Sequence, residues 1–259
     1  MKGGTMTRKL LLLLALLIAA VGAFAEGEEE YWVQPMKEVH KNFKGTKGFV
    51  AMYGDSITYD KNFWTPMGKG KVLNNKEVDI KKIRAYVAKE SWFAKGTANC
   101  NMDRWTVKDA MKIIDGVLEK QKPEVAIVMY GTNDFRDAFE INHYDVEYRD
   151  LLKKIMATGC VPIISTLPPN NLNPGMLAVY NPEIRKIAVE LKIPLVEFYE
   201  ECMKRQPEKA IPILCDGIHP TWGGESDFSE DALNTSGYNL RNYLTVKMFD
   251  KVYEKVLKQ

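Results

Sequence analysis

Histidine is the scarcest reactive residue of this chain, with 3 copies among 259 residues. So few imidazoles are a thin supply of ligands for a two-metal site, which disfavours the metal-dependent hydrolases. His40 and His143 lie in polar segments that adjoin no predicted strand end. His219 instead lies three residues after Asp216, in the segment DGIHP. His219 is therefore the candidate for a general base.

Cysteine is nearly as scarce, and its spacing fits no zinc-binding pattern. The cysteines are Cys100, Cys160, Cys202 and Cys215, and no CxxC pair occurs. Two interpretations of them stay open. Cys202 and Cys215 flank a proline-containing segment that a disulfide can close, or the cysteines are buried free thiols. The sequence does not decide the pairing.

An excess of charge of either sign is also missing. The chain has 36 Lys and Arg residues against 34 Asp and Glu residues, and its formal net charge is +2. A near-neutral chain has no basic footprint for nucleic acid or for anionic membranes. The sequence therefore predicts no nucleic-acid partner, and it predicts no metal or other cofactor.

A long apolar run occurs only near the N-terminus, from Leu10 to Val21. A basic start precedes it and the small-x-small segment Ala23-Phe24-Ala25 follows it, which is the pattern of a secretory signal peptide. The run is shorter than the roughly 20 residues that a spanning helix needs, so we expect no stable membrane anchor. The sequence predicts a signal peptide over residues 1–25, cleavage after Ala25, and a secreted or periplasmic protein.

Beyond this leader, short apolar runs alternate with longer amphipathic segments. The apolar runs predict buried strands at Gly48–Tyr53, Val125–Tyr130, Val161–Leu167 and Ile193–Phe198. Helical periodicity occurs at Thr106–Leu118, Tyr144–Ala157, Pro182–Leu191, Tyr238–Leu257 and, with room for a short strand just after it, at Asp79–Phe93. This alternation predicts an α/β fold with a doubly wound parallel sheet, in one domain over residues 47–259 that follows an extension over 26–46.

Polar segments follow the first two of these strands directly. Gly54-Asp55-Ser56 ends the first strand, and Gly131-Thr132-Asn133-Asp134 ends the second. Both fall on one rim, because ligands of open parallel sheets bind at the carboxyl ends of the strands. Ser56 at a helix N-terminus is a candidate nucleophile, and the Asn133 amide can donate to an oxyanion. Taken singly, the two also fit a helix cap and an Asx turn.

Asp216 and His219 supply the remaining parts of this chemistry. Their spacing places both on one loop, where Asp216 can hold one imidazole nitrogen while the other faces Ser56. The three segments together predict a Ser-His-Asp triad and acyl transfer. Thr58 stands two residues after Ser56 in place of a glycine, so the G-x-S-x-G elbow of the α/β-hydrolases is missing.

With these segments in place, the chain resembles the SGNH hydrolases, also called GDSL-type esterases and lipases, over residues 47–245. The first, third and fifth blocks of that family match at Gly54–Thr58, Gly131–Asp134 and Asp216–Pro220. The resemblance implies a three-layer α/β/α sandwich with a flavodoxin-like five-stranded parallel sheet. It carries the catalytic roles onto Ser56, Asp216 and His219, and it carries oxyanion roles onto Asn133 and the backbone N–H of Ser56.

The second block departs from the family pattern. The family usually has a glycine there, shortly before a helix, whose backbone N–H contributes to the oxyanion hole. The helix here opens at Thr106, which puts Arg104 at that position, while the nearest glycine is Gly96. A residue other than glycine can still donate its N–H where its backbone geometry is allowed. Arg104 is thus a candidate backbone donor, and its side chain either suits an anionic substrate or points to solvent.

The leading functional prediction is a secreted serine esterase for short acyl esters, with O-acetyl groups on carbohydrates as the first substrate class. Trp64, Trp92, Trp105 and Trp222 lie near the motifs and offer either a sugar-stacking surface or core packing. The acyl length, the alcohol and the oligomeric state stay open.

Three alternatives accompany this prediction. One is a lysophospholipase or thioesterase with the same chemistry. Another is a glycan-binding homologue whose catalysis is weakened by the change at Arg104. The least favoured is a metal-dependent phosphoesterase, in which Asp55, Asn133, Asp216 and His219 would be ligands.

Overall fold

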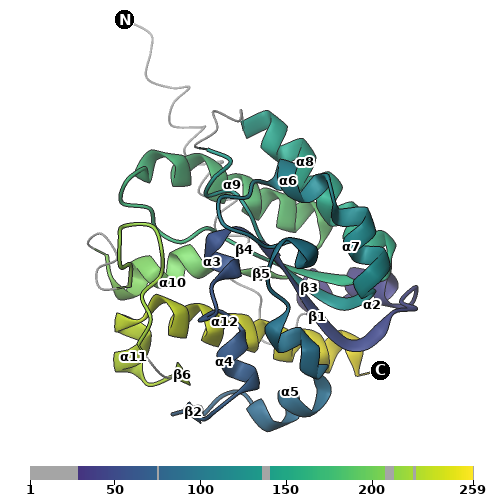
Figure 1. Ribbon diagram of the computed structural model, residues 1–259, viewed down its shortest axis with the longest axis horizontal. Coiled ribbons are helices and arrows are strands. Elements are labelled where there is room, and N and C mark those ends of the chain that lie inside the picture. Colours follow the sequence, from purple (N-terminus) through teal and green to yellow (C-terminus); the bar gives the residue numbers. More distant parts are fainter. Residues whose placement is uncertain (1–28, 75, 136–140, 208–212, 224–225, 259) are drawn as a thin grey trace, which may run out of the picture.

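A computed structural model describes residues 29–74, 76–135, 141–207, 213–223 and 226–258, so the predicted signal peptide lies outside the described residues. The central sheet is parallel and has the strand order β1-β3-β4-β5 (Figure 1). Its strands are β1 (Thr46–Gly54), β3 (Pro123–Met129), β4 (Val161–Ser165) and β5 (Leu195–Val196). Each overlaps one of the apolar runs, so the predicted parallel α/β sheet is confirmed.

The predicted fifth strand of this sheet is reduced to one bridge in the described residues. Asn101 forms an isolated parallel bridge with Gly54, at the free edge of β1. The preceding residue, Cys100, has φ +58°, a left-handed conformation that interrupts an extended strand. With this bridge counted, the order is that of flavodoxin-like sheets. A separate two-stranded sheet pairs β2 (Val72–Leu73) with β6 (Ser226–Asp227).

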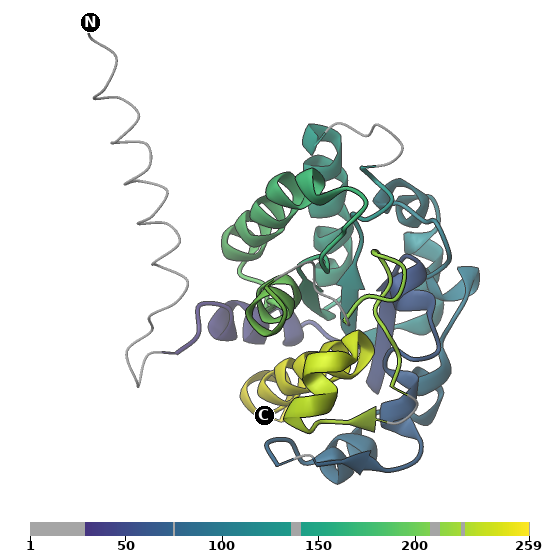
Figure 2. The ribbon, with the colours of Figure 1, turned by 90° about the vertical axis from the view of Figure 1, so that its left-hand side faces the viewer.

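Helices cover both faces of the sheet, which gives the three layers (Figures 1 and 2). One face carries α6 (Val107–Met111), α7 (Ile114–Gln121), α8 (Ile141–Ala157) and α9 (Pro174–Leu191). The other carries α2 (Val33–His40), α5 (Ile80–Tyr86), α10 (Phe198–Arg205) and α12 (Gly237–Val252). Shorter elements are α3 (Ser56–Tyr59), α4 (Thr65–Gly68), α11 (Glu230–Thr235), the 3₁₀ turns Lys89–Phe93 and Thr97–Asn99, and a π-helical turn at Tyr253–Leu257.

Two helices differ from their predicted bounds for local reasons. The predicted helix over 106–118 is divided, because the N–H of Ile113 bonds the carbonyl of Ala110, three residues back, before α7 begins. Thr106 caps α6 as expected, with Asp109 completing a capping box. Helix α9 starts at Pro174 and continues through Pro182. Proline suits the first turn of a helix, so Pro174 marks the true start.

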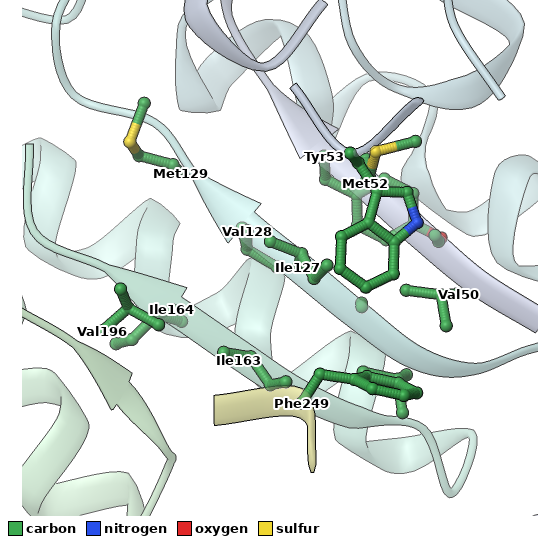
Figure 3. Close-up of a cluster of buried hydrophobic side chains, with 14 of the residues drawn as sticks. Val50, Met52, Tyr53, Ile127, Val128, Met129, Ile163, Ile164, Val196 and Phe249 are labelled. Carbon is green, nitrogen blue, oxygen red and sulfur yellow. The ribbon is translucent and has the colours of Figure 1, made fainter. Parts of the chain in front are cut away.

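The core lies between the sheet and the helices on each face. Every residue of β3 is buried, and its side chains pack with those of β1 and β4 and with Phe249 of α12 (Figure 3). Trp32, Val33 and Met36 belong to the same core, so the predicted extension contributes α2 to the domain. Cys100, Cys160 and Cys202 are buried free thiols, and Cys215 is an exposed free thiol. The structure therefore agrees with the free-thiol alternative and has no Cys202–Cys215 disulfide.

Candidate active site

Ser56 is the first residue of α3, two residues beyond the end of β1. Asp55 caps this single turn, because its Oδ1 accepts the N–H of Ile57 at 3.0 Å. Gly54 is needed for the sharp exit from the strand. A Cβ there would lie 2.3 Å from Thr58 Oγ1 and 2.6 Å from the carbonyl oxygen of Met129. The tight turn presents Ser56 at the carboxyl rim of the sheet, where sequence placed it.

Ser56, His219 and Asp216 form a continuous chain of hydrogen bonds. Ser56 Oγ lies 2.9 Å from His219 Nε2. His219 Nδ1 lies 2.7 Å from Asp216 Oδ2. The chain joins residues 163 positions apart in sequence, so the fold itself brings the base to the serine. This is the arrangement in which an imidazole can take the proton of a serine hydroxyl while a carboxylate fixes its tautomer.

The loop that carries the base is folded by its own hydrogen bonds. An antiparallel bridge between Leu214 and Pro220 closes it at its base. Inside it, Asp216 Oδ1 accepts the backbone N–H groups of Ile218 at 2.9 Å and of His219 at 2.7 Å. The DGIHP segment is therefore an Asx-type turn, in which one oxygen of Asp216 holds the backbone and the other holds the imidazole.

The same contacts keep Asp216 ionised. Partial burial alone would raise its pKa, but hydrogen bonds from the His219 backbone N–H, the His219 imidazole and the Ile218 N–H outweigh this and lower the pKa to about 2. A negative carboxylate thus faces His219 throughout the pH range in which esterases work, and it stabilises the imidazolium that forms when the serine is deprotonated.

Asn133 lies on the neighbouring strand end, on the same rim. Gly131 turns the chain away from β3 with φ +136°, where a Cβ would meet the Leu167 side chain at 2.8 Å. Asn133 is 8% exposed, and its Nδ2 donates to the carbonyl of Trp105 at 3.2 Å. The amide nitrogen has two hydrogens, so one of them is left for a substrate oxygen.

Arg104 has a left-handed backbone conformation, which favours glycine. Its φ is +64°, a left-handed conformation in which glycine is unstrained and other residues are rare. Gly96 lies outside the pocket that contains Ser56, whereas Arg104 lines it. Arg104 therefore lies beside the candidate nucleophile, and its role as a backbone donor stays a prediction. The guanidinium is exposed, and within the described ranges it makes no hydrogen bond or ion pair.

A pocket of about 400 Å³ opens above these residues. It is lined by Ser56, Asp103, Arg104, Thr132, Asn133, Asn170, Asn173, Ile218 and His219. Ile218 is the apolar member, and the other side chains are polar or charged. Sequence reasoning missed Asn170 and Asn173. They follow β4, so the rule that placed Ser56 and Asn133 at strand ends could also have found them.

Two buried carboxyl groups lie beneath the pocket. Asp134 Oδ1 accepts the N–H of Val107 at 2.9 Å, which ties the start of α6 to the end of β3. Burial raises the pKa of Asp134 to about 7, against the hydrogen bond from Val107 and with the Asp55 charge adding to the rise. Burial also raises the pKa of Asp55 to about 6, against the Ile57 N–H and the charge of Arg241. Both groups therefore titrate near neutral pH.

Several alternatives raised by the sequence can be compared with this geometry. Trp64 and Trp92 are buried and stack on each other at 5.0 Å, so these two are core residues and not a sugar-binding surface. Across the described ranges, no group of three or more His, Cys, Asp or Glu side chains is placed to hold a metal ion. None of the helices that the structure describes has the length and apolarity of a membrane span.

Comparison with known proteins places the chain in a family. The model of the GDSL-like lipase/acylhydrolase family matches residues 52–225, which include Ser56, Arg104, Asn133, Asp216 and His219. The chain belongs to this family, and it is a carboxylic ester hydrolase. No curated protein sequence matches it.

Solved structures share the fold at low sequence identity. A lipase/acylhydrolase from Enterococcus faecalis has a TM-score of 0.57 at 15% identity, over 78% of this chain and 95% of that one. The psychrotrophic esterase EstA from Pseudoalteromonas sp. has a TM-score of 0.54 at 15% identity, over 80% of this chain and 100% of that one. An acetylxylan esterase from Geobacillus stearothermophilus has a TM-score of 0.52 at 15% identity, over 83% of this chain and 96% of that one.

Proposed function

We propose that this protein is a secreted serine esterase that removes short acyl groups, foremost O-acetyl groups, from a polar alcohol such as a carbohydrate. The observation that carries the proposal is the hydrogen-bonded chain Ser56–His219–Asp216 at a pocket with almost entirely polar lining. Ser56 is the nucleophile, His219 the base and Asp216 its orienting partner. The signal-peptide pattern of residues 1–25 supports a site of action outside the cytoplasm.

The reaction proceeds in two halves on these side chains. His219 Nε2 takes the proton of Ser56 as Oγ attacks the ester carbonyl carbon, and it then gives that proton to the departing alcohol. The acyl group is left on Ser56 Oγ. Water attacks it with His219 again as base, and the proton returns to Ser56 as the carboxylic acid leaves. Asp216 remains ionised throughout, in line with its lowered pKa.

The tetrahedral oxyanion has three donors in this proposal. They are the backbone N–H groups of Ser56 and Arg104 and the Asn133 amide. The N–H of Ser56 is available because the first N–H groups of a helix have no carbonyl partner within it. Each donor contributes on the order of 3 kcal/mol to the transition state in related sites. Arg104 retains a backbone N–H, as every residue except proline does, so the missing glycine does not by itself remove a donor.

The pocket lining favours a short acyl group and a polar alcohol. A long acyl chain needs an extended apolar wall, and Ile218 is the single apolar side chain among the residues that line the pocket. Asn170 and Asn173 offer amides that can bond sugar hydroxyls. The similarity in fold to an acetylxylan esterase from Geobacillus stearothermophilus agrees with this substrate class.

The test is hydrolysis of aryl acetate, butyrate and octanoate esters by the wild-type protein and by Ser56→Ala. We expect the rate to fall as the acyl chain grows and to drop by about 10⁴-fold or more in Ser56→Ala. A rate that rises with acyl length would favour a lysophospholipase or thioesterase. Equal, slow hydrolysis by both proteins would instead favour a glycan-binding homologue without catalysis.

A further inference from the structure

The helical turn that begins at Ser56 is too short to be stable by itself. It has 4 residues, and an isolated turn of helix is unfavourable because nucleation costs more than one hydrogen bond returns. Within it, the carbonyl of Asp55 accepts from Thr58 and Tyr59, and the carbonyl of Ser56 accepts from Asp60. The carbonyls of Ile57 and Thr58 are left to partners from elsewhere in the chain.

Two cationic side chains take these carbonyls. Arg241 of α12 donates from Nη1 to the carbonyl of Ile57 at 2.6 Å and from Nη2 to Thr58 Oγ1 at 2.9 Å. Lys95 donates from Nζ to the carbonyl of Thr58 at 2.5 Å. Tyr238, one turn before Arg241, places its hydroxyl 3.4 Å from the carbonyl of Ile57. Arg241, Lys95 and Tyr238 thus hold the C-terminal end of the turn, on the side away from the pocket.

Arg241 is an unusual residue for the place where it lies. It is 1% exposed, and its guanidinium lies 3.6 Å from the centre of the Phe63 ring. Burial lowers the pKa of Arg241 to about 10, while Tyr238 and the carboxylates of Asp55 and Asp60 oppose that shift. Burial of a guanidinium costs several kcal/mol unless it is paired and hydrogen-bonded, whereas an apolar side chain would fill the same space at no such cost.

The charges around the turn are balanced across three segments. Asp55 and Asp60 flank α3 at its two ends, Arg241 comes from α12, and Lys95 comes from the segment after the 3₁₀ turn Lys89–Phe93. Burial and the charge of Arg241 lower the pKa of Lys95 to about 7, and Asp60 opposes this. The lysine remains a hydrogen-bond donor in both protonation states, so its contact with Thr58 does not require the charge.

We propose that Arg241, supported by Lys95, is a positioning residue for Ser56. This inference rests on the proposed serine esterase function. The guanidinium fork bonds a backbone carbonyl and a side-chain hydroxyl of the same turn, which fixes the rotation of that turn. The rotation sets both the 2.9 Å contact of Ser56 with His219 and the direction of the Ser56 N–H. A misplacement of reacting groups by about 1 Å can cost about a hundredfold in rate.

The experiment compares Arg241→Met and Arg241→Lys with Arg185→Met as a matched control. Arg185 is a paired arginine of α9 that bonds Glu197 and Glu200 and makes no hydrogen bond to the turn. For Arg241→Met we expect kcat for an aryl acetate, per folded molecule, to fall about a hundredfold with KM within about twofold. Inactivation by an aryl phosphonate ester, which reports the reactivity of Ser56, should slow in parallel. Arg241→Lys should recover part of the loss, because an ammonium can bond one of the two acceptors.

A purely structural role for Arg241 would lower the unfolding temperature and leave kcat per folded molecule unchanged, which would overturn the proposal. Equal losses in Arg241→Met and Arg185→Met would overturn it too. If Arg241→Met does not fold, Arg241→Lys decides: a lowered kcat with unchanged KM supports the proposal, and a wild-type kcat overturns it. Ser56→Ala distinguishes a failure of the proposed esterase function from a failure of the positioning role. Activity that survives Ser56→Ala refutes the esterase function itself, whereas an inactive Ser56→Ala beside a fully active Arg241→Lys refutes the positioning role alone.

Discussion

The two ends of the Ser56–His219–Asp216 chain are held in different ways. Ser56 starts a turn among buried side chains, where Asp55 and Ile57 are 0% exposed and Arg241 is 1% exposed. His219 and Asp216 lie on a loop, with 38% and 53% of their side chains exposed. Besides its cap and internal bonds, the turn is held by donors more than 30 positions away in sequence, whereas the loop is held by bonds between its own neighbours.

Because of this difference, mutations at the two ends should differ in how strongly they affect stability and catalysis. A change in the turn disturbs α12, the sheet and the serine together, because all of them share its contacts. A change in the loop can alter the imidazole and leave the core intact. The contact of Asn171, whose N–H donates to the carbonyl of Gly217 at 2.7 Å, is one tether between the loop and the rest of the rim.

The largest expected effect is a loss of kcat from Asp216→Asn, a change in the loop that alters the chemistry of His219. Asp216→Asn keeps an oxygen that can accept the N–H groups of Ile218 and His219, so the loop should hold its shape. Its amide, however, donates to Nδ1 of His219 and forces the proton onto Nε2, which can then no longer accept the proton of Ser56. We expect kcat to fall about 10⁴-fold with only a small fall in the unfolding temperature, because the lost charge of Asp216 is more than half exposed. A large fall in that temperature would show that the loop is not self-contained.

The next effect is the loss of stability when one glycine at each end is replaced by alanine. In Gly54→Ala the new methyl would lie 2.3 Å from Thr58 Oγ1, the atom that Arg241 bonds, so we expect a loss of about 3 kcal/mol in stability together with lower kcat. In Gly217→Ala the nearest atom is 3.5 Å away, and only the φ of +86° opposes the methyl, at about 1 to 2 kcal/mol. Denaturant unfolding and kcat per folded molecule measure both. Equal losses of stability would remove the contrast between the two ends.

The rim of the site could be predicted from sequence because it depends on local signals. Gly48–Tyr53 and Val125–Tyr130 are apolar runs that parallel strands require, and each passes directly into a polar segment. That fixes Ser56 and Asn133 at neighbouring strand ends. The position of Arg104 followed from Thr106, whose capping role is a local one. The blocks around Asp216 and His219 are likewise contained within five residues.

The supports of the site could not be predicted because they depend on tertiary packing. An arginine in a helical pattern is expected at the surface, and nothing local marks Arg241 as buried except its three-residue spacing from Tyr238, which also contacts the turn. The shortened fifth strand depends on the left-handed Cys100, which sequence does not signal at a residue other than glycine. The predicted helix start at Pro182 is wrong, because α9 starts at Pro174 and Pro182 lies inside it.

A third effect is the pH dependence of stability, to which the carboxyl groups of Asp134 and Asp216 contribute with opposite sign. The pKa of Asp134, beneath the buried end, is raised to about 7, so its contribution to stability is complete below its unfolded pKa near 4 and is lost as pH rises to 7. The pKa of Asp216 is lowered to about 2, so its contribution is present above pH 4 and is lost as pH falls to 2. Wild-type stability should therefore fall between pH 5 and pH 7, and above pH 7 the lowered pKa of Lys95 acts in the opposite direction. In Asp134→Asn that fall should shrink by on the order of 2 kcal/mol, with the remainder due to Asp55. An identical pH profile in both proteins would mean that Asp134 does not titrate in this range.

The smallest effect concerns Arg104, which lies between the two ends. Arg104→Gly relieves the left-handed conformation and also loosens the unfolded chain, so we expect a net gain of only about 0.5 kcal/mol in stability. The backbone N–H is retained, and kcat for a neutral acetate should stay within about threefold. Arg104→Ala keeps the strain and the N–H, and it should match the wild type in stability. If Arg104 recognises an anionic alcohol, both variants will raise KM for an acetylated uronate and leave KM for an acetylated neutral sugar unchanged. A loss of kcat on every substrate in both variants would mean that the guanidinium acts on the reacting ester, and the oxyanion site would then include a charge that the family pattern does not have.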